Sequence, residues 1–239
     1  MISLSKSLLI VVCTIFSIPL FSQLQKVSSL KQNKHFIYAN FSLSRGILTN
    51  GIQDIDIPGI PNTYFEDLKK GINISGDLYF TLNDKHNLGI TLQRFRSHNQ
   101  IDNMVFTDDQ GNNYTGILKD DFRLLFIGPS WVSTSRSYNQ DNEFSSTLSI
   151  GYHSFTNLST AFLPVKITSE SLGVFIKLAY AYYLDDNLSI GINAAYLNTV
   201  VKSYKYEFFD GSTDTIDLQE DEYEGWGRLT FGVSVGFRF

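Results

Sequence analysis

The feature that most constrains this chain is a strict alternation of bulky apolar residues with small or polar ones near its C-terminus. One face of residues 229–239 carries Leu229, Phe231, Val233, Val235, Phe237 and Phe239. The other face of the same segment carries Arg228, Thr230, Gly232, Ser234, Gly236 and Arg238. A period of two is the period of a β-strand, whose successive side chains point to opposite sides. The segment is therefore predicted to be a strand that separates two different environments.

The same alternation recurs in earlier segments of the chain. These segments lie near residues 35–45, 72–82, 88–93, 117–132, 148–153, 172–183 and 188–193. In 117–132 apolar residues occupy both faces, so the register of that strand stays open. With the C-terminal segment this gives eight candidate strands, the smallest number found in bacterial membrane barrels.

The connections between these segments alternate in length. Short ones are expected at 83–87, 135–142 and 185–187, and long ones at 47–69, 97–114, 156–167 and 207–224. Short periplasmic turns and longer extracellular loops are the pattern of outer-membrane barrels. The sequence thus predicts an all-β, eight-stranded antiparallel up-and-down transmembrane β-barrel over residues 35–239, with both termini periplasmic.

The composition of the two faces decides which one points outward. A soluble barrel would place the apolar face inside and a charge-rich face in water. Here the second face consists mainly of Gly, Ser, Ala, Thr, Asn and Tyr, and such residues suit the narrow interior of eight strands. The bulky apolar face is therefore predicted to contact lipid. Aromatic residues at the strand ends, Tyr180, Tyr182, Phe237 and Phe239, fit an aromatic girdle.

The first residues have the pattern of a secretory signal. Lys6 precedes an apolar run over residues 8–16, Pro19 interrupts it, and the small Ser22 precedes Gln23. A basic start, a short apolar stretch and a small exit residue are the marks of a cleaved signal peptide. We expect a signal peptide over 1–22 and a short periplasmic lead over 23–34. The single cysteine of the chain lies within the signal, so cysteine-based metal sites and nucleophiles are excluded from the mature protein.

The C-terminal strand carries a resemblance to a known class of proteins. The segment Phe231–Phe239 resembles the insertion signal of bacterial outer-membrane proteins, in which Phe231, Val233, Val235, Phe237 and Phe239 are the apolar positions. This resemblance implies recognition by the barrel-assembly machinery. The mature chain as a whole resembles small OmpA- and OmpX-type barrels, and the ending Phe21–Gln23 resembles export signals of Bacteroidetes members, including PorT-like proteins. The class hosts many activities, so it predicts location more than task.

Charged residues on the inner face form the first candidate site. They are Asp77, His153, Lys177, Arg228 and Arg238. Buried charges persist when they are paired or hydrated, so we expect Asp77 to contact Lys177 or Arg238. The favoured interpretation is a salt-bridged network that plugs the barrel. A path for protons or small solutes along these groups is the alternative.

His153 is the best catalytic candidate, because some small barrels are lipid-modifying hydrolases that use a serine, a histidine and an acid. Its neighbour Ser154 points to the opposite face, and the position two residues on is Phe155. Catalysis is therefore the least favoured reading, and no catalytic residue or cofactor is expected.

Two further charged segments point to partners. The last long connection, 207–224, is acidic, and dense carboxylates can bind calcium, but the spacing lacks the calcium-loop pattern. A solvated loop is favoured over a metal bridge to lipopolysaccharide phosphates. Arg94, Arg96 and His98 lie at the end of one strand, where arginines can pair with lipopolysaccharide phosphate or occupy an ordinary interface position.

The sequence as a whole predicts a non-enzymatic outer-membrane barrel that acts in envelope structure, in surface interaction or as an accessory subunit of an outer-membrane complex. A narrow pore and a lipid-modifying enzyme are the alternatives. The net charge of −5 and the lack of a basic patch speak against nucleic acid as a partner.

Overall fold

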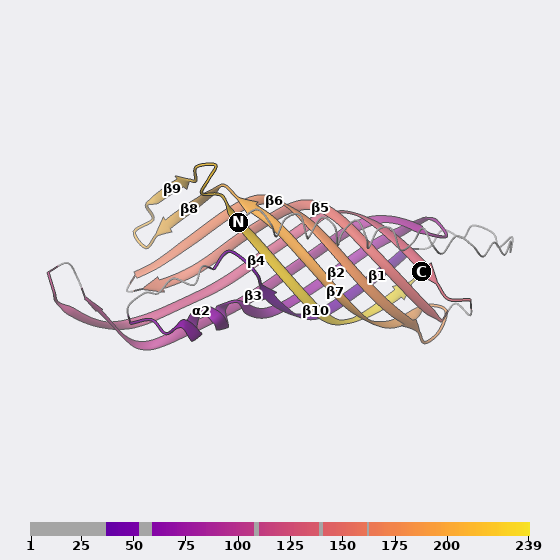
Figure 1. Cartoon of the computed structure of the whole chain (residues 1–239), viewed down its shortest axis with the longest axis horizontal. Helices are drawn as coiled ribbons and strands as arrows, with labels where there is room; N and C mark the ends of the chain where they lie inside the picture. The colour runs from indigo at the N-terminus through magenta and orange to yellow at the C-terminus, as the bar shows by residue number, and fades with distance from the viewer. Residues whose placement is uncertain (1–36, 53–58, 108–109, 139–140, 162) are drawn as a thin grey trace. The chain divides into compact units, whose positions relative to one another are not determined.

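The computed structural model describes residues 37–52, 59–107, 110–138, 141–161 and 163–239. They belong to one compact unit, His35–Phe239. The expected signal peptide and periplasmic lead lie outside the described residues. Figure 1 shows long, tilted strands wound into a barrel, with the C-terminus at the end that carries the short turns.

Eight strands form a closed antiparallel barrel, as predicted. The barrel strands are β1 (Ile37–Leu48), β2 (Lys70–Asn83), β3 (His86–Thr107), β4 (Asn113–Arg136), β5 (Asn142–Ala161), β6 (Leu163–Tyr183), β7 (Leu188–Val201) and β10 (Glu224–Arg238). Closure comes from β1, which pairs with both β2 and β10, while β10 pairs with β7. A hairpin of β8 (Ser203–Phe208) and β9 (Thr213–Asp217) extends the sheet beyond the barrel by pairing with β6.

The stagger of the strands fixes the width of the interior. A row of paired residues that leaves β3 at Arg96 passes around the barrel and returns to β3 at His86, ten residues away. Such a stagger tilts the strands against the barrel axis, typically by about 35–45°. Eight tilted strands leave an interior that side chains can fill, which explains the small residues on the inner face.

The structure resolves the register of β4. Its even-numbered residues point inward, including Phe122, Leu124 and Phe126, and its odd-numbered residues Leu125 and Ile127 are exposed. Both faces are apolar because the inner face of β4 contributes to two buried hydrophobic clusters. For that reason, the sequence of this strand did not distinguish its inner face from its outer face.

Three of the expected long loops contain β-strand. Strands β3 and β4 pair as far as Thr107 and Asn113, and β5 and β6 pair as far as Ala161 and Leu163, so these connections are extended hairpins. The acidic connection contains β8 and β9. The prediction of a long connection is confirmed between β7 and β10 and is wrong for β3–β4 and β5–β6. These four strands extend past the apolar band, where both faces are rich in polar residues and the alternation fades.

The connection between β1 and β2 contains a short helix, α2 (Asn62–Leu68), which the sequence analysis did not foresee. Its buried residues are Tyr64 and Leu68, and its contacts are with β3 and β2. Among the described residues, no helix has the length and apolar character needed to cross a membrane.

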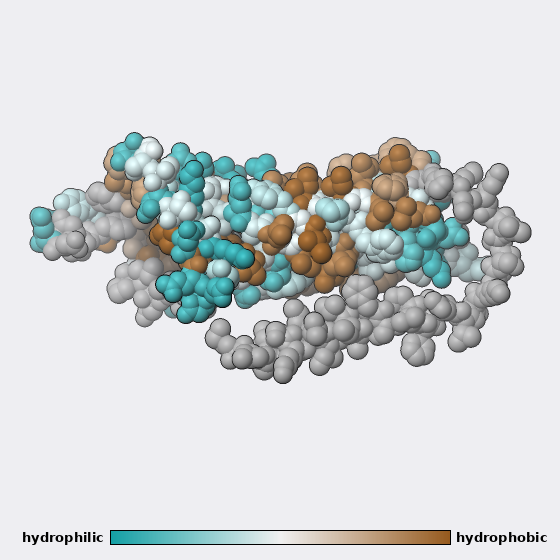
Figure 2. All heavy atoms as spheres, turned by 90° about the horizontal axis from the view of Figure 1, so that it is seen from above, coloured by the Kyte–Doolittle hydropathy of each residue, from teal (hydrophilic) through white to brown (hydrophobic). Residues whose placement is uncertain are grey.

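The outer face is apolar over the middle of the barrel. The five apolar positions of the predicted insertion signal are all exposed, from 40% for Val235 and Phe237 to 72% for Phe239. Tyr180 and Tyr182 are exposed as well. In Figure 2, hydrophobic side chains gather over the middle of the barrel, and hydrophilic ones gather over the end with the long strands.

Candidate functional site

The interior of the barrel is the first candidate site, and a buried ion pair lies across it. Lys177 on β6 donates a hydrogen bond from Nζ to Oδ2 of Asp77 on β2. Their side chains are 3% and 0% exposed. The structure thus brings Asp77 together with Lys177, one of the two contacts that the sequence suggested.

Neighbouring polar groups complete this layer. Thr91 donates to Asp77 Oδ1 over 2.8 Å, and Ser130 donates to Thr91 Oγ1 over 2.8 Å. Lys177 Nζ also lies 3.2 Å from the hydroxyl oxygen of Tyr79. Removing a charge pair from water costs several kcal/mol per ion. The attraction between the two charges offsets this cost only when further hydrogen bonds satisfy their remaining polar atoms. Asp77 has both oxygens bonded, so the layer meets this requirement.

Arg228 and His153 belong to a second layer. The Arg228 Nη2 atom donates to Gln93 Oε1 over 2.7 Å, and the guanidinium carbon lies 5.2 Å from the centre of the Phe95 ring. His153 is 1% exposed, and its Nδ1 lies 3.3 Å from Ser171 Oγ. These residues are not in the Asp77 layer, so the five predicted charges do not form one network.

Apolar side chains occupy part of the interior as well. Phe126 and Phe175 lie in contact, with their ring centres 5.7 Å apart, and they form a buried cluster with Ala195 and Leu197. Both rings are fully buried.

Arg238 lies in a third group, at the end with the short turns. Its guanidinium carbon is 5.7 Å from the centre of the Tyr38 ring. Arg136 lies beside the same ring and forms an ion pair with Glu143 over 2.6 Å. A cavity of about 50 Å³ adjoins this group and is lined by residues that include Lys177 at its inner limit.

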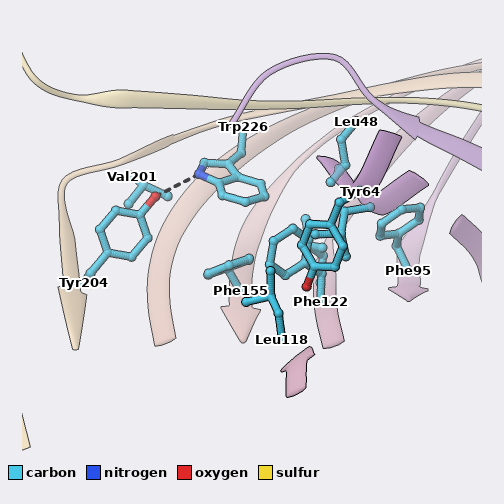
Figure 3. Packing of buried hydrophobic residues seen from close by; sticks show 11 residues of the cluster. Leu48, Tyr64, Phe95, Leu118, Phe122, Phe155, Val201, Tyr204 and Trp226 are labelled. Atoms are coloured by element: carbon cyan, nitrogen blue, oxygen red, sulfur yellow. Dashed lines mark hydrogen bonds between the residues drawn. The ribbon is translucent and has the colours of Figure 1, made fainter. Parts of the chain in front are cut away.

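An aromatic cluster fills the opposite end of the barrel, and sequence reasoning missed it. Figure 3 shows Trp226, Phe155, Phe122 and Tyr204 gathered in one cluster with Tyr64 of α2. The centres of the Phe155 and Trp226 rings lie 4.4 Å apart. We call this group the mouth cluster. Its 11 buried residues are Leu48, Tyr64, Leu68, Phe95, Leu118, Phe122, Leu124, Phe155, Val201, Tyr204 and Trp226.

Hydrogen bonds anchor the mouth cluster to the wall. The Tyr64 hydroxyl donates to Asp120 Oδ2 over 2.7 Å, and the Trp226 indole donates to the Tyr204 hydroxyl oxygen over 2.9 Å. Ser97 donates to the carbonyl of Leu68 over 2.6 Å and so fixes the end of α2. Burial, together with the bond to Asp120, raises the pKa of Tyr64 far above its usual value. The neutral hydroxyl therefore persists as a donor at all physiological pH values.

The geometry around His153 does not form a hydrolase triad among the described residues. Ser171 on the adjacent strand supplies a hydroxyl group that the sequence alone could not place beside His153. Both groups face the interior, and His153 Nε2 has no hydrogen-bond partner in the described part of the chain. Among the residues that the structure describes, no carboxylate is hydrogen-bonded to the pair, and the imidazole is buried in the interior.

The acidic connection forms a hairpin in which several carboxylates have partners of their own. Glu207 pairs with Lys166 over 2.9 Å, and Asp210 accepts hydrogen bonds from the backbone and side chain of Ser212. In the described ranges, no group of three or more His, Cys, Asp or Glu residues is arranged to hold a metal ion.

Several solved structures of bacterial outer-membrane proteins align with most of this chain. The outer membrane protein OprG of Pseudomonas aeruginosa aligns with 86% of this chain and 95% of its own, at 11% identity and a TM-score of 0.53. The outer membrane protease OmpT of Escherichia coli covers 90% and 99%, at 9% identity and a TM-score of 0.49. Neisserial surface protein A covers 83% and 96%, at 12% identity and a TM-score of 0.49.

The likeness to OprG is one of fold. At these identities it carries no residue roles from one protein to the other. No protein-family model matches the chain, and no curated protein matches it by sequence.

Proposed function

We propose that the protein is an integral outer-membrane β-barrel with a closed interior. One observation carries the proposal. A closed barrel exposes a band of large apolar side chains, while ion-paired and hydrogen-bonded groups fill its inside. Water would disfavour such an outer surface, whereas lipid suits it.

The proposed orientation places both ends of the barrel domain in the periplasm. β1 begins and β10 ends at the side of the short turns, where Ile37 and Phe239 form backbone hydrogen bonds with each other. The extended hairpins, α2 and the β8–β9 hairpin then face the outside of the cell. This arrangement follows the usual asymmetry of loop lengths in such barrels.

The proposed role is structural and interactive and involves no catalysis. The extended wall of β3–β6 and the β8–β9 hairpin provide surface outside the membrane for partners, or for docking within a larger outer-membrane complex. The buried ion pair and the Phe126–Phe175 contact oppose a narrow pore. The enclosed His153 and Ser171 oppose action on lipids. Membership of the PorT-like Bacteroidetes proteins remains part of the proposal, supported by the ending Phe21–Gln23.

Membrane fractionation tests the location. The full chain should appear with the outer membrane and should migrate differently on gels before and after heating. A tag inserted after Gly211, in the turn between β8 and β9, should be accessible to antibody on intact cells, and a tag after Asp186 should not. Recovery in the soluble fraction would contradict the proposal, and the reverse labelling would contradict the orientation.

Planar-bilayer recordings test the closed interior. The purified protein should show no stable channel openings. Discrete openings with a reproducible conductance would favour the narrow pore instead. A pull-down from native membranes tests the idea of an accessory subunit, and recovery of the protein strictly alone would contradict that idea.

A further inference from the structure

Positive charge is concentrated on one side of the outer wall, at the edge of the apolar band nearest the extended hairpins. Six outward-facing cations lie there on the neighbouring strands β1 to β4. They are Arg45, Lys70, Arg94, Arg96, Lys119 and Arg123, and we call them the basic belt. On the other side of the barrel, the first outward positions beyond the apolar stripes are Ser154, Thr156, Glu170 and Asn198. The cations farther along these strands have partners there, since Lys166 pairs with Glu207 and Lys202 lies over the ring of Tyr223. The asymmetry matters because the whole chain has a net charge of −5.

The register of the sheet brings these cations together. Arg96 on β3 lies directly opposite Arg123 on β4. Arg45 on β1 lies in the same row, because Ile72 pairs with both Arg45 and Arg96. Neighbouring strands are about 4.8 Å apart, so the backbones of Arg45 and Arg96 are separated by about 10 Å.

One carboxylate within the belt neutralises part of this charge. Asp121 accepts from Arg96 Nε over 2.8 Å and from Arg123 Nη2 over 2.6 Å. Lys70 lies 3.4 Å from Asp67 in an exposed pair. Arg45, Arg94 and Lys119 form no ion pair with any described residue. Six cations face two carboxylates, which leaves a surplus of positive charge.

The belt adjoins large apolar side chains on the same strands. Leu43 precedes Arg45, Ile74 pairs with Arg94, and Leu125 pairs with Arg94 from the other side. All three apolar residues are exposed. A matching ligand therefore has anionic groups directly attached to an acylated, hydrophobic part.

We propose that the basic belt binds the phosphate groups of lipid A, the acylated glycolipid anchor of lipopolysaccharide. This inference rests on the proposed location and orientation, which place the belt at the outer leaflet. Guanidinium groups pair with phosphate oxygens in a bidentate manner. The acyl chains then lie along the apolar stripes of β1 to β4.

The test compares two charge-matched double variants of the full chain in detergent micelles. The variant R45Q/R94Q removes two cations that have no ion pair among the described residues, so folding should be retained. The control K202Q/K205Q removes two cations near the β8–β9 hairpin. The dissociation constant for bisphosphorylated lipid A should rise about tenfold or more in R45Q/R94Q. The loss of one charged contact worth about 1.4 kcal/mol raises a dissociation constant tenfold. The control should bind like the unmodified protein.

Two further arms distinguish the chemistry of the ligand. Lipid A stripped of both phosphates should bind as weakly to the unmodified protein as intact lipid A binds to R45Q/R94Q. Inositol hexakisphosphate, which has phosphates and no acyl chains, should compete poorly. Equal binding of the stripped lipid, equal weakening in the control, or full competition by the soluble polyphosphate would each overturn the proposal.

The failure of this proposal can be told apart from failure of the proposed function. A protein that fractionates with the outer membrane but binds lipid A regardless of phosphate contradicts only the basic belt. A protein absent from the outer membrane contradicts the proposed function first.

Discussion

Asp77 and Lys177 form an ion pair between opposite walls of the barrel. β2 and β6 are four strands apart in either direction around the closed sheet, so this contact spans the full width of the interior. The pair is buried, Thr91 donates a hydrogen bond to Asp77, and Ser130 donates one to Thr91, so the ion pair ties the two walls together.

Replacing one partner of this pair should be strongly destabilising. In K177M the carboxylate of Asp77 is left in the interior without its cation, and the loss of one partner of a buried pair costs about 3–5 kcal/mol. The measurement is the midpoint of unfolding by guanidinium chloride for the protein refolded in lipid vesicles. A midpoint equal to that of the unmodified protein would contradict the prediction, because the fold would then not depend on the pairing of Asp77 with Lys177.

The double variant D77L/K177M provides the control for this prediction. Apolar residues of similar size in place of both charges should recover most of the lost stability, because no charge stays unpaired. The double variant should also remain non-conducting in planar bilayers. A double variant as unstable as K177M would point to damaged packing as the cause.

The two tryptophans should report opposite environments. Trp131 is 46% exposed on the outer face of β4, and Trp226 is 5% exposed within the mouth cluster. In vesicles with brominated acyl chains, the W226F variant, which retains Trp131, should be strongly quenched. The W131F variant, which retains Trp226, should be quenched little, and its emission should lie at shorter wavelength than that of a tryptophan in water. The reverse pattern would contradict the proposed lipid contact of the outer face.

Asp121 in the basic belt should titrate at unusually low pH. Burial raises the pKa of its carboxyl, but hydrogen bonds and charge from Arg96 and Arg123 outweigh burial, and the pKa is about 2. Asp121 lies beyond the apolar band, so water and buffer reach its partners. A lowered folded-state pKa stabilises the fold above the usual value of about 3.9, and this stabilisation is lost as the pH falls through about 2.

Carbon-13 NMR of the Asp121 carboxyl in micelles checks this value. The double variant R96Q/R123Q should raise the pKa of Asp121 toward its usual range, whereas R45Q, which removes a belt cation that does not contact Asp121, should leave it unchanged. An Asp121 pKa near 4 in the unmodified protein would show that the two arginines do not hold the carboxylate in solution.

Alternation predicted the barrel because lipid on one side and a narrow interior on the other impose opposite residue types on each strand. This held for β10, where Phe231 and Val233 face outward and Thr230 and Ser234 are buried. It also placed Asp77 and Lys177 on inner faces. It did not place Arg238, because period-two alternation gives the face of a residue but leaves its depth along the barrel undetermined.

The mouth cluster was beyond sequence reasoning for a physical reason. Its residues come from distant segments, and several lie where the alternation is weak. Trp226 lies between two glycines, Tyr64 lies in a polar connection, and Phe122 lies on a strand with two apolar faces. Only the closed register places these side chains at one end of the interior. The one sequence signal for this cluster is the pair of aromatic residues Tyr204 and Trp226, which lie on either side of the acidic connection.

A row of glycines allows three strands to bend closely past one another, and this row supports the last prediction. Gly151 on β5 pairs with Gly173 on β6, and a Cβ on Gly151 would lie against the backbone carbonyl of Ile127 and the Cα of Gly128, too close for non-bonded atoms. The variant G151A should therefore force the backbones of β4 and β5 apart and lower stability by about 1–3 kcal/mol, the usual cost of overpacking. The matched control is G225A, because the nearest atom of the described residues to a Cβ on Gly225 would be Asn50 Nδ2, at 3.9 Å. The two variants are compared by their midpoints of unfolding by guanidinium chloride in vesicles. A G151A protein as stable as G225A would show that β4 and β5 accommodate a methyl group at this position without strain.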